Sequence, residues 1–458
     1  MHVGIDFGTT NTVVAVVDDA HSSPRVLPID GDARTMRTML YVARDHATHF
    51  GAAAIRRYRE RNVGRLPRFV KKYIGEIDIE LGELSAKGYD LKGGAVVVDV
   101  FTDVDADSPG RLLHSLKGPL ATDYTGTTIF GRDYTLEDLI AAFLEDVRRR
   151  VEEQTGRSVR RAVFGRPVHF ASAENDELKN AHAQDRLEAA AHAAGFKDVQ
   201  FEYEPIGACL AYAARRSGGD QRVLVFDFGG GTLDLAVVHF RADGRRDILA
   251  TGGLGIAGDH FDRALFRAVM AEHFGRDVRW GQQRLPLPEH IVAALGDWQD
   301  LAGLSNAKTI YFLREAQRDC DAPIQLLALE DLIARGYAFD VYDRVERAKV
   351  ELSRARAAEI AFAAGTIDVW RIAARTRFET AIAQERRAIA AAVDDVLARA
   401  GVSPSQIDHV VRTGGSSSIP CIVELLHTRF GPQKIRDEDH YTAVAAGLAL
   451  RAAEWQKK

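Results

Sequence analysis

Cysteine is scarce in this sequence. Its 458 residues include three cysteines, Cys209, Cys320 and Cys421, which lie far apart in the chain. This spacing excludes a disulfide framework and a Cys-x-x-Cys metal site. It is typical of proteins from a reducing compartment.

Long hydrophobic runs are also missing. No stretch reaches the ~18 consecutive apolar residues that a membrane helix needs. Residues 1–6 lack the basic head and apolar run of a secretory signal. We therefore expect a cytoplasmic protein with no membrane partner.

Positive charge is not in excess. Lys and Arg total 60 and Asp and Glu total 65, which gives a formal net charge of −5. Proteins that bind the nucleic-acid backbone need a basic excess, so the sequence argues against such a partner. Hydrophobic residues at 46% and charged residues at 27% form an ordinary globular mixture, which excludes extensive disorder. The length alone corresponds to roughly three domains.

A weak internal repeat organises what is present. Residues 3–17 read VGIDFGTTNTVVAVV, and residues 223–238 read VLVFDFGGGTLDLAVV. Each copy is typical of a strand, a tight turn and a second strand. The repeat predicts two related lobes, each opening with a glycine-rich hairpin.

Helical patterns fall between and after the two hairpins. Thr135 and Asp138 resemble a capping box, and Gly156 follows the end of that helix. Helices are expected over residues 135–154, 174–194, 259–274, 344–362, 377–400 and 442–455. Two stretches, 76–133 and 280–340, break the pattern and are interpreted as insertions. The alternation of strands and helices predicts an α/β fold with layered sheets.

The two turns have the composition of phosphate clamps. Glycine lets the backbone approach phosphate oxygens, and threonine adds a hydroxyl donor. An ordinary hairpin would explain one such loop, but two matched copies favour phosphate binding. The predicted clamp residues are Gly8, Thr9, Thr10 and Asn11 in the first copy and Gly229, Gly230, Gly231 and Thr232 in the second. Neither copy is a P-loop, since GxxxxGK[ST] does not occur.

Acidic residues stand at the ends of the same strands. Asp6 and Asp227 precede the two turns, and Asp234 lies on the second outgoing strand. Mg²⁺ keeps most of its waters and takes few carboxylates, so these three are the predicted metal residues.

A third glycine loop follows the segment IDHVVRT and precedes a helix expected from Pro420. Gly414, Gly415 and Ser416 could lie against a nucleoside at that helix N-terminus. A plain loop is the alternative when this segment is considered by itself.

Taken together and in order, these motifs resemble the nucleotide-binding domain of the heat-shock protein 70 chaperones, within the actin-like ATPase superfamily. The matching segments are VGIDFGTTNT, RTMRTMLYV, FGAAAI, KKYIG, NDELKNAHAQDRLEAAAHAAGFKDVQFEYEPIGACLAY, VLVFDFGGGTLDLAVV, GIAGDHFD, ERAKVELS, TGGSSSIP and TAVAAGLALRAA. The overall pattern is closest to the YegD-type branch, which lacks a peptide-binding domain.

This resemblance implies an actin-like ATPase fold with two lobes, each containing a ribonuclease-H-like core sheet, and a nucleotide in the cleft between them. Residues 1–205 would form lobe I and residues 206–430 lobe II, with the two insertions inside them. Residues 431–458 would return to lobe I as a C-terminal helix, and no peptide-binding domain would follow.

The resemblance also implies roles for single residues. Lys71 would reach the γ-phosphate and the attacking water, although by itself it is typical of a solvated lysine. Glu204 would hold the metal's water shell, although by itself it is typical of a surface carboxylate. Asp227 and Thr232 complete the implied catalytic set. Further nucleotide contacts are implied for Gly258, Glu346, Lys349 and Ser353.

Three positions depart from the family pattern. Val350 and Ser418 stand where the family places two arginines around the adenine ring, which puts base affinity and ATP preference in doubt. His260 replaces an acidic residue in GIAGDHFD. Arg347 and Arg412 lie near the altered positions in the sequence.

The leading functional hypothesis is an ATP- and ADP-binding protein of the heat-shock 70 type. It would hydrolyse ATP slowly with Mg²⁺, rotate its lobes and act on clients or co-chaperones that the sequence does not identify. One alternative is an actin-fold kinase for a sugar-type acceptor, which needs a base beside the acceptor hydroxyl. Another is a nucleotide-gated scaffold or polymer.

Overall fold

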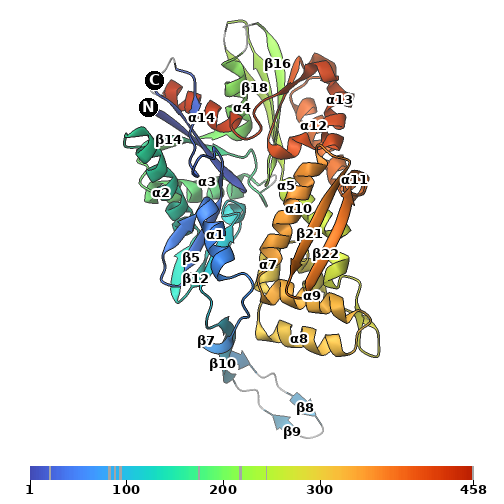
Figure 1. Cartoon of the computed structure of the whole chain (residues 1–458). Coiled ribbons are helices and arrows are strands. Elements are labelled where there is room, and N and C mark those ends of the chain that lie inside the picture. The colour runs from blue at the N-terminus through green and yellow to red at the C-terminus, as the bar shows by residue number, and fades with distance from the viewer. Residues whose placement is uncertain are drawn as a thin grey trace.

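The molecule consists of two lobes that lie side by side, with a long hairpin projecting from one end (Figure 1). The computed structural model describes residues 1–19, 22–80, 84–86, 89–91, 95–173, 176–215, 219–243 and 245–455. We call the part around the first large sheet lobe I and the part around the second lobe II. The domain boundaries expected at 205/206 and 430/431 stay a prediction.

The sheet of lobe I has the strand order β15-β14-β1-β2-β3, and β4 also pairs with β2. β1 is antiparallel to β2 and parallel to β14, and β14 is parallel to β15. The strands are β1 (His2–Phe7), β2 (Asn11–Val17), β3 (Arg25–Val26), β4 (Met36–Arg37), β14 (Arg161–Arg166) and β15 (Asp198–Tyr203).

The sheet of lobe II repeats this arrangement in the order β24-β23-β16-β17-β18. β16 is antiparallel to β17 and parallel to β23, as β1 is to β2 and β14. The strands are β16 (Gln221–Phe228), β17 (Leu233–Phe240), β18 (Arg246–Leu254), β23 (His409–Thr413) and β24 (Ile435–Asp437). Both predicted hairpins and the internal repeat are confirmed, because strand order and strand direction agree in the two sheets.

Helices cover the sheet of lobe I. The helix α2 (Leu136–Thr155) begins with the predicted capping box, in which the Asp138 amide donates to the Thr135 hydroxyl at 3.0 Å. It ends at Gly156, whose φ of 64° needs the left-handed conformation that glycine tolerates. The other helices of this lobe are α1 (Gly51–Arg61) and α3 (Glu177–Ala193).

The expected helices over 259–274 and 377–400 occur in lobe II, each divided into two shorter helices. The expected helix over 344–362 is wrong beyond Leu352, because residues 357–364 form a strand that pairs with 367–374. The elements are α5 (Gly258–Val269), α10 (Ala338–Leu352), β21 (Ala357–Ala364), β22 (Ile367–Ala374), α11 (Arg375–Ala381), α12 (Ala383–Arg399) and α13 (Pro420–Phe430).

Two helices that are distant in sequence pack tightly beneath the cleft. The helix α4 (Glu204–Ala213) lies against α14 (Ala443–Trp455), and α14 also packs on β1 and β2. A Cβ added at Gly447 would lie 1.7 Å from the Gly207 carbonyl oxygen, and one at Gly4 would lie 2.2 Å from the Ala449 nitrogen. Glycine is required at these positions because the backbones themselves are in contact.

Residues 76–133 contain most of the projecting hairpin and the elements that follow it. The hairpin strands β7 (Phe69–Glu80) and β10 (Ala95–Asp105) are antiparallel, and β10 includes the expected strand at 95–101. The remaining elements are β8 (Leu84–Ala86), β9 (Tyr89–Leu91), β11 (Gly110–His114), η1 (Gly118–Ala121), β12 (Gly126–Ile129) and β13 (Arg132–Thr135). The strand β11 pairs with β5 (Met39–Ala43), which also pairs with β6 (Thr48–Phe50).

Residues 280–340 are mainly helical and contribute to the core of lobe II. Their elements are β19 (Arg279–Trp280), β20 (Leu285–Pro286), α6 (Glu289–Ala294), α7 (Trp298–Gly303), α8 (Ala307–Arg318) and α9 (Pro323–Ala334), and a short 3-10 helix, η2 (Ala271–Phe274), precedes them.

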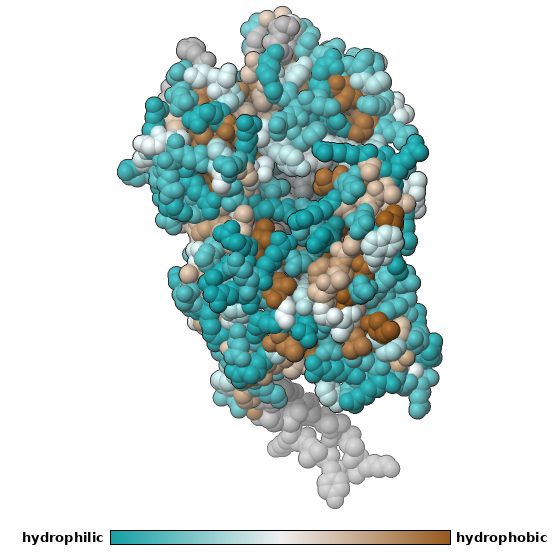
Figure 2. All heavy atoms as spheres, in the orientation of Figure 1, coloured by the Kyte–Doolittle hydropathy of each residue, from teal (hydrophilic) through white to brown (hydrophobic). Residues whose placement is uncertain are grey.

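Among the described residues, no helix combines the length and the apolar composition needed to cross a membrane. Hydrophobic side chains form small scattered patches on the face in Figure 2, and most of that face is hydrophilic.

Candidate functional site

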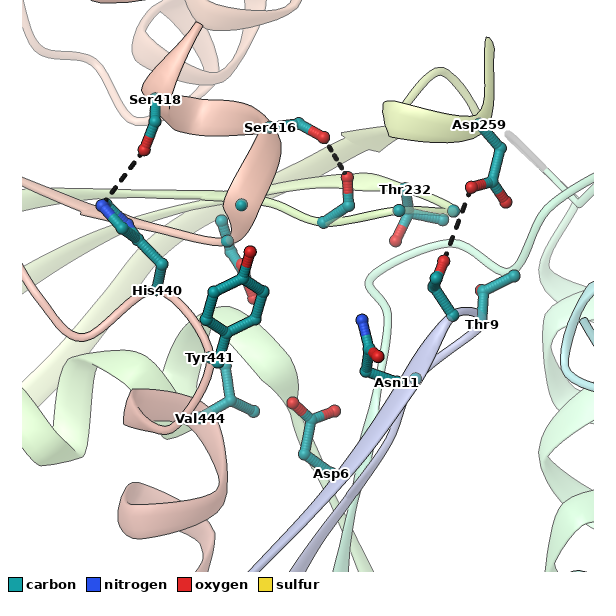
Figure 3. A pocket seen from close by; sticks show the side chains of 18 of the residues that line it. Asp6, Thr9, Asn11, Thr232, Asp259, Ser416, Ser418, His440, Tyr441 and Val444 are labelled. Carbon is teal, nitrogen blue, oxygen red and sulfur yellow. Dashed lines mark hydrogen bonds between the residues drawn. The ribbon is translucent and has the colours of Figure 1, made fainter. Parts of the chain in front are cut away.

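A cavity of about 380 Å³ lies where the two lobes meet, and we call it the main cavity. Both glycine turns, the third glycine loop and the end of α10 line it. Figure 3 shows labelled side chains of the two turns and the third loop, among them Asn11, Thr232 and Ser416, around a common space. The predicted site residues that line it are Asp6, Gly8, Thr9, Thr10, Asn11, Glu204, Asp227, Gly229, Gly230, Gly231, Thr232, Asp234, Glu346, Lys349, Ser353, Gly414, Gly415 and Ser416.

The two turns have matching backbone geometry. The Gly8 amide donates to the Asn11 carbonyl at 3.1 Å, and the Gly229 amide donates to the Thr232 carbonyl at 3.2 Å. A third threonine, Thr38, donates its hydroxyl to the Gly8 carbonyl at 2.8 Å and holds the first turn in place. The cavity is therefore bordered by two equivalent turns, one from each lobe.

The tips of the two turns touch. A Cβ at Gly230 would lie 2.1 Å from the Thr10 hydroxyl oxygen, and one at Gly231 would lie 2.2 Å from that of Thr9. Side chains at these two glycine positions would collide with the opposite turn. The glycines thus serve the contact between lobes as well as the shape of the turn.

Four carboxylates gather at the strand ends beside the turns. Asp227 and Asp234 are direct cross-strand partners, and both are buried. Asp6 comes from β1, and Glu204 begins α4. Like charges placed opposite each other across a ladder are destabilising, so this cluster needs a positive partner when it is ionised.

Electrostatics at this cluster are strongly perturbed. Burial and the nearby Glu204 carboxylate raise the pKa of Asp6 and of Asp234 to about 7. The same two causes raise the pKa of Asp227 well above its ordinary value. The Thr232 hydroxyl, which donates to Asp234 at 2.7 Å, acts in the opposite direction on the pKa of Asp234.

Lys71, the lysine expected at the phosphates, lies outside the main cavity. It is exposed on β7 and faces Asp103 in the ladder of the projecting hairpin. Lys117, which precedes η1, lines the cavity and forms a buried ion pair with Glu204. The hairpin that begins at Phe69 carries the lysine-bearing segment away from the main cavity. After this hairpin, the chain returns to the cavity only beyond β11, at Lys117.

The third glycine loop packs against the second turn. The Ser416 hydroxyl donates to the Gly229 carbonyl at 2.6 Å, and Gly414 has a φ of 78°. Gly258 does not line the main cavity but lies directly behind it, since its amide also donates to Gly229, at 3.2 Å. A Cβ at Gly258 would lie 2.7 Å from the Ser416 hydroxyl oxygen, so this position supports the wall.

The residues expected at the nucleoside lie along the end of α10. Lys349 donates to Asp262 and, at 3.1 Å, to the Gly258 carbonyl. Glu346 receives two hydrogen bonds from Arg37 of lobe I, one of them at 2.9 Å. Ser353 lines the same wall.

The positions that depart from the family pattern also line the main cavity. Val350 is half exposed there, and the Ser418 hydroxyl is 3.1 Å from Nε2 of His440. Arg412 lies outside the lining and bonds to Asp437 and the Ser417 carbonyl instead. Arg347 is likewise absent from the lining and pairs with Asp343.

Several lining residues were missed in the sequence, and four of them bear on the chemistry of the site. Lys117 follows a segment with no distinctive pattern, and Asp259 looked like an ordinary first-turn acid of α5. Arg354 and Tyr441 lie at the same end of the cavity as Val350 and the third loop, where the Tyr441 hydroxyl is 3.1 Å from a Cβ built at Gly415. Arg354 lies just beyond the end of α10, so the helical spacing of the sequence does not place it.

Comparison with known protein families identifies a family for this chain. A family model described as Hsp70 protein matches residues 117–282 and 337–456, together more than half of the chain. The matched segments begin at Lys117 and contain the second turn, α10 and the third loop. With the two repeated sheets, this match confirms the actin-like ATPase fold expected from the sequence.

Proposed function

Because the chain belongs to the Hsp70 family, whose members bind ATP and ADP, we propose that the main cavity is its nucleotide site and that it hydrolyses ATP slowly. The observation that carries the proposal is the pair of equivalent turns that meet beside a buried acidic cluster. Within the family, we propose the YegD-type branch, to which the overall sequence pattern is closest.

The nucleotide's phosphates would lie over the two turns. Glycine at four of the eight turn positions allows close approach of the backbone, and Thr9, Thr10 and Thr232 supply hydroxyl donors. This placement uses residues from both lobes, so a bound phosphate chain would hold the lobes together.

The acidic cluster fits a hydrated divalent cation. Among the described residues, no three His, Cys, Asp or Glu side chains could hold a metal ion by themselves, which is compatible with Mg²⁺ because that ion retains most of its waters. Asp6, Asp227 and Asp234 would hold those waters, and Glu204 would orient them. Mg²⁺ would supply charge neutralisation at the phosphates.

Lys117 would act on the transferred phosphoryl group. Its ammonium is buried against Glu204 and lies within electrostatic range of Asp6, Asp227 and Asp234. Its positive charge partly opposes the rise in the pKa values of these three carboxylates. Phosphoryl transfer depends mainly on positioning and charge stabilisation, and an arginine finger can contribute roughly 10³–10⁵ in rate. Of the described residues that line the cavity, Arg354 is the single arginine, and it lies near Val350 at the other end. Because Arg354 lies away from the transferred phosphoryl group, it would not stabilise the charge of the transition state, and we expect hydrolysis to be slow.

The nucleotide base would be held differently from the base in the family pattern, in which two arginines enclose the adenine ring. Tyr441 projects into the cavity between the third loop and Asn11 (Figure 3). Arg354 follows the end of α10, lines the same cavity and is exposed. A tyrosine ring and a guanidinium plane can both stack on a base. We assign them the base contacts in place of Val350 and Ser418.

Contacts between the lobes would couple the nucleotide to a lobe rotation. Arg59 on α1 donates to Asp340 at 2.6 Å and to Asp343 at 3.0 Å on α10, and Arg37 donates to Glu346 on the same helix. Since α10 also carries Lys349, movement at the nucleoside end would reach these interlobe ion pairs. Through this movement the protein would bind and release a partner, in a chaperone-related role.

The proposal can be tested by calorimetric titration with ATP, ADP and GTP, each with and without Mg²⁺. We expect one saturable site for the adenine nucleotides, with tighter binding when Mg²⁺ is present. Phosphate release should then occur with ATP alone, without an added hydroxyl compound. Absence of binding by every nucleotide would refute the proposal, and turnover that requires an added acceptor would favour a kinase.

A further inference from the structure

A second cavity of about 260 Å³ adjoins the main cavity. The two share the turn tips and two acidic residues, Asp259 and Glu346, but the second cavity does not include the Asp6 cluster. Residues of both lobes line it, among them Arg37 and His114 from lobe I and Trp298 and Tyr342 from lobe II. The nucleotide site described above makes no use of this space.

One side of the second cavity is aromatic. The rings of His114 and Trp298 lie 5.0 Å apart between centroids, and those of Trp298 and Phe339 lie 5.3 Å apart. The Tyr342 hydroxyl donates to the Leu295 carbonyl at 2.6 Å, so its polar end is satisfied elsewhere. These rings offer apolar faces to a ligand.

The charged residues that line the second cavity are unbalanced. Five carboxylates accompany two arginines in the lining: Asp259, Asp262, Asp297, Asp343 and Glu346 with Arg37 and Arg263. Arg37 is committed to Glu346, and Arg263 approaches Asp297 at 3.4 Å. Asp343 pairs with Arg59 and Arg347, and Asp262 pairs with Lys349. Asp259 is therefore the one carboxylate of this lining without an ion pair among the described residues.

Asp259 and Asp262 have carboxylate oxygens whose hydrogen bonding is incomplete. The Asp259 carboxylate contacts the Thr10 hydroxyl at 3.5 Å, which is a long hydrogen bond. Asp262 gives one oxygen to Lys349, while its Oδ1 is buried and has no hydrogen-bond partner among the described residues. Nδ1 of His114 is also buried without a partner among the described residues, and it is a further acceptor in the tautomer that is protonated on Nε2. Buried acceptors without donors are costly, so a donor-rich ligand would stabilise this cavity.

We propose that the second cavity binds a small aliphatic amine, whose ammonium group lies between Asp259 and Asp262 and whose carbon chain packs on Trp298. An ammonium group offers three donors and no acceptor, which matches a lining rich in acceptors. It also gains from the face of an aromatic ring. A bare metal ion fits less well, because no group of three or more ligating side chains exists among the described residues.

Because Asp259 lines both cavities, a bound amine would also change the affinity of the main cavity for a nucleotide. A cation beside the turn tips would attract the phosphates of a nucleotide in the main cavity. By linkage, each ligand would then raise the affinity for the other by the same factor. This second effect rests on the proposed nucleotide function, whereas amine binding does not.

Calorimetric titration of the nucleotide-free protein with 1,4-diaminobutane tests the site. The neutral control is 1,4-butanediol at the same ionic strength, since it has the same carbon chain without charge. We expect one saturable site for the diamine and none for the diol. Asp259→Asn should weaken diamine binding at least tenfold, whereas Asp368→Asn, a change at an exposed carboxylate on β22, should leave it unchanged.

Three results would overturn the proposal: no saturable diamine binding, equal binding of the diol, or unchanged affinity in Asp259→Asn. Asp262→Asn provides the same comparison if Asp259→Asn does not fold. A repeat titration with ADP present measures the linkage. If the diamine binds without ADP but ADP itself does not bind, the nucleotide proposal fails and the amine site stands.

Discussion

Lys117 and Glu204 form a buried ion pair that joins segments 87 residues apart at the edge of the main cavity. Each side chain is less than one-eighth exposed, and each neighbours the cluster of Asp6, Asp227 and Asp234. A buried charge that loses its partner is strongly destabilising. The pair therefore fixes the lysine at the proposed phosphate site and compensates one of the four acids.

Replacing Lys117 tests its catalytic assignment directly. We expect Lys117→Met to lower the rate of phosphate release from ATP by 10²-fold or more, because charge stabilisation at the transferred group is lost. The matched control is Lys71→Met, which alters an exposed lysine on the hairpin and should leave the rate unchanged. Single-turnover measurement at saturating ATP separates this effect from binding. Equal rates in the two variants would assign the chemistry elsewhere.

The acidic cluster predicts an unusual pH dependence of stability. The pKa of Asp6 is about 7 in the folded protein against an ordinary value of 3.8, so folding favours the protonated form. Its stabilising contribution is complete below pH 3.8 and is lost as the pH rises through about 7. We expect the melting temperature of the nucleotide-free protein to fall by a few degrees more between pH 5.5 and 8 than that of Asp6→Asn.

Mg²⁺ and ADP should reverse that loss, because a cation favours the ionised carboxylates. Melting curves across the pH series, with and without Mg²⁺–ADP, provide the measurement. Parallel curves for the wild type and Asp6→Asn at every pH would show that Asp6 does not titrate in this range.

The contact between the turn tips predicts a double-mutant coupling. Gly230→Ala places a methyl group 2.1 Å from the Thr10 hydroxyl oxygen, and we expect it to cost about 1–3 kcal/mol of unfolding free energy through overpacking. In a Thr10→Ala background the obstructing hydroxyl is gone, so the cost should be smaller by about 0.5 kcal/mol or more. Denaturant unfolding of the four proteins measures the difference. An additive result would mean that the tips do not touch in solution.

Tyr441 should determine how well the base is held. Tyr441→Ala removes a half-exposed ring that lies against the third loop at Gly415, and we expect ADP to bind roughly threefold to tenfold more weakly through the loss of stacking. Affinity for tripolyphosphate, which has no base, should not change. Tyr311→Ala, a change at an exposed tyrosine on α8, is the control. Equal loss of both ligands would place Tyr441 at the phosphates instead.

The interlobe ion pairs should set the rate of nucleotide release. Arg59→Ala removes two hydrogen bonds to α10 and the contact of the guanidinium with the Phe339 ring at 5.3 Å. We expect ADP to dissociate several-fold faster, measured by stopped-flow displacement of a fluorescent analogue. Arg56→Ala on the exposed face of the same helix serves as the control. Unchanged release in Arg59→Ala would indicate that opening occurs at another contact.

The parts of the fold that were predictable are those encoded by short-range patterns. The Asp-Phe-Gly turns occur with flanking apolar runs, and both hairpins have the expected strands. Thr135 and Asp138 form their capping box because the four residues involved are adjacent. The repeat also predicts two equivalent turns, because each turn lies in the hairpin that begins the sheet of its own lobe.

The errors arose where a distant contact decides the outcome. Residues 357–364 have alanines that suit a helix. They form a strand because they pair with residues 367–374 and pack side chains into the core of lobe II. Lys71 has the local context of a phosphate-binding lysine, yet its ladder partner on β10 holds it on the projecting hairpin. Lys117 is in the cleft because β11 pairs with β5, and no neighbouring residue in the sequence indicates that pairing.

The packing of α14 on β1 and β2 has a consequence for the order of folding during synthesis. Val13, Ala15 and Val17 of the first hairpin are covered by Ala445 and Ala449, which the ribosome adds hundreds of residues later. Until then, one face of the earliest sheet has no partner. Lobe I can therefore complete its core only after lobe II has been translated, and the nascent N-terminal half should stay sensitive to proteases throughout elongation.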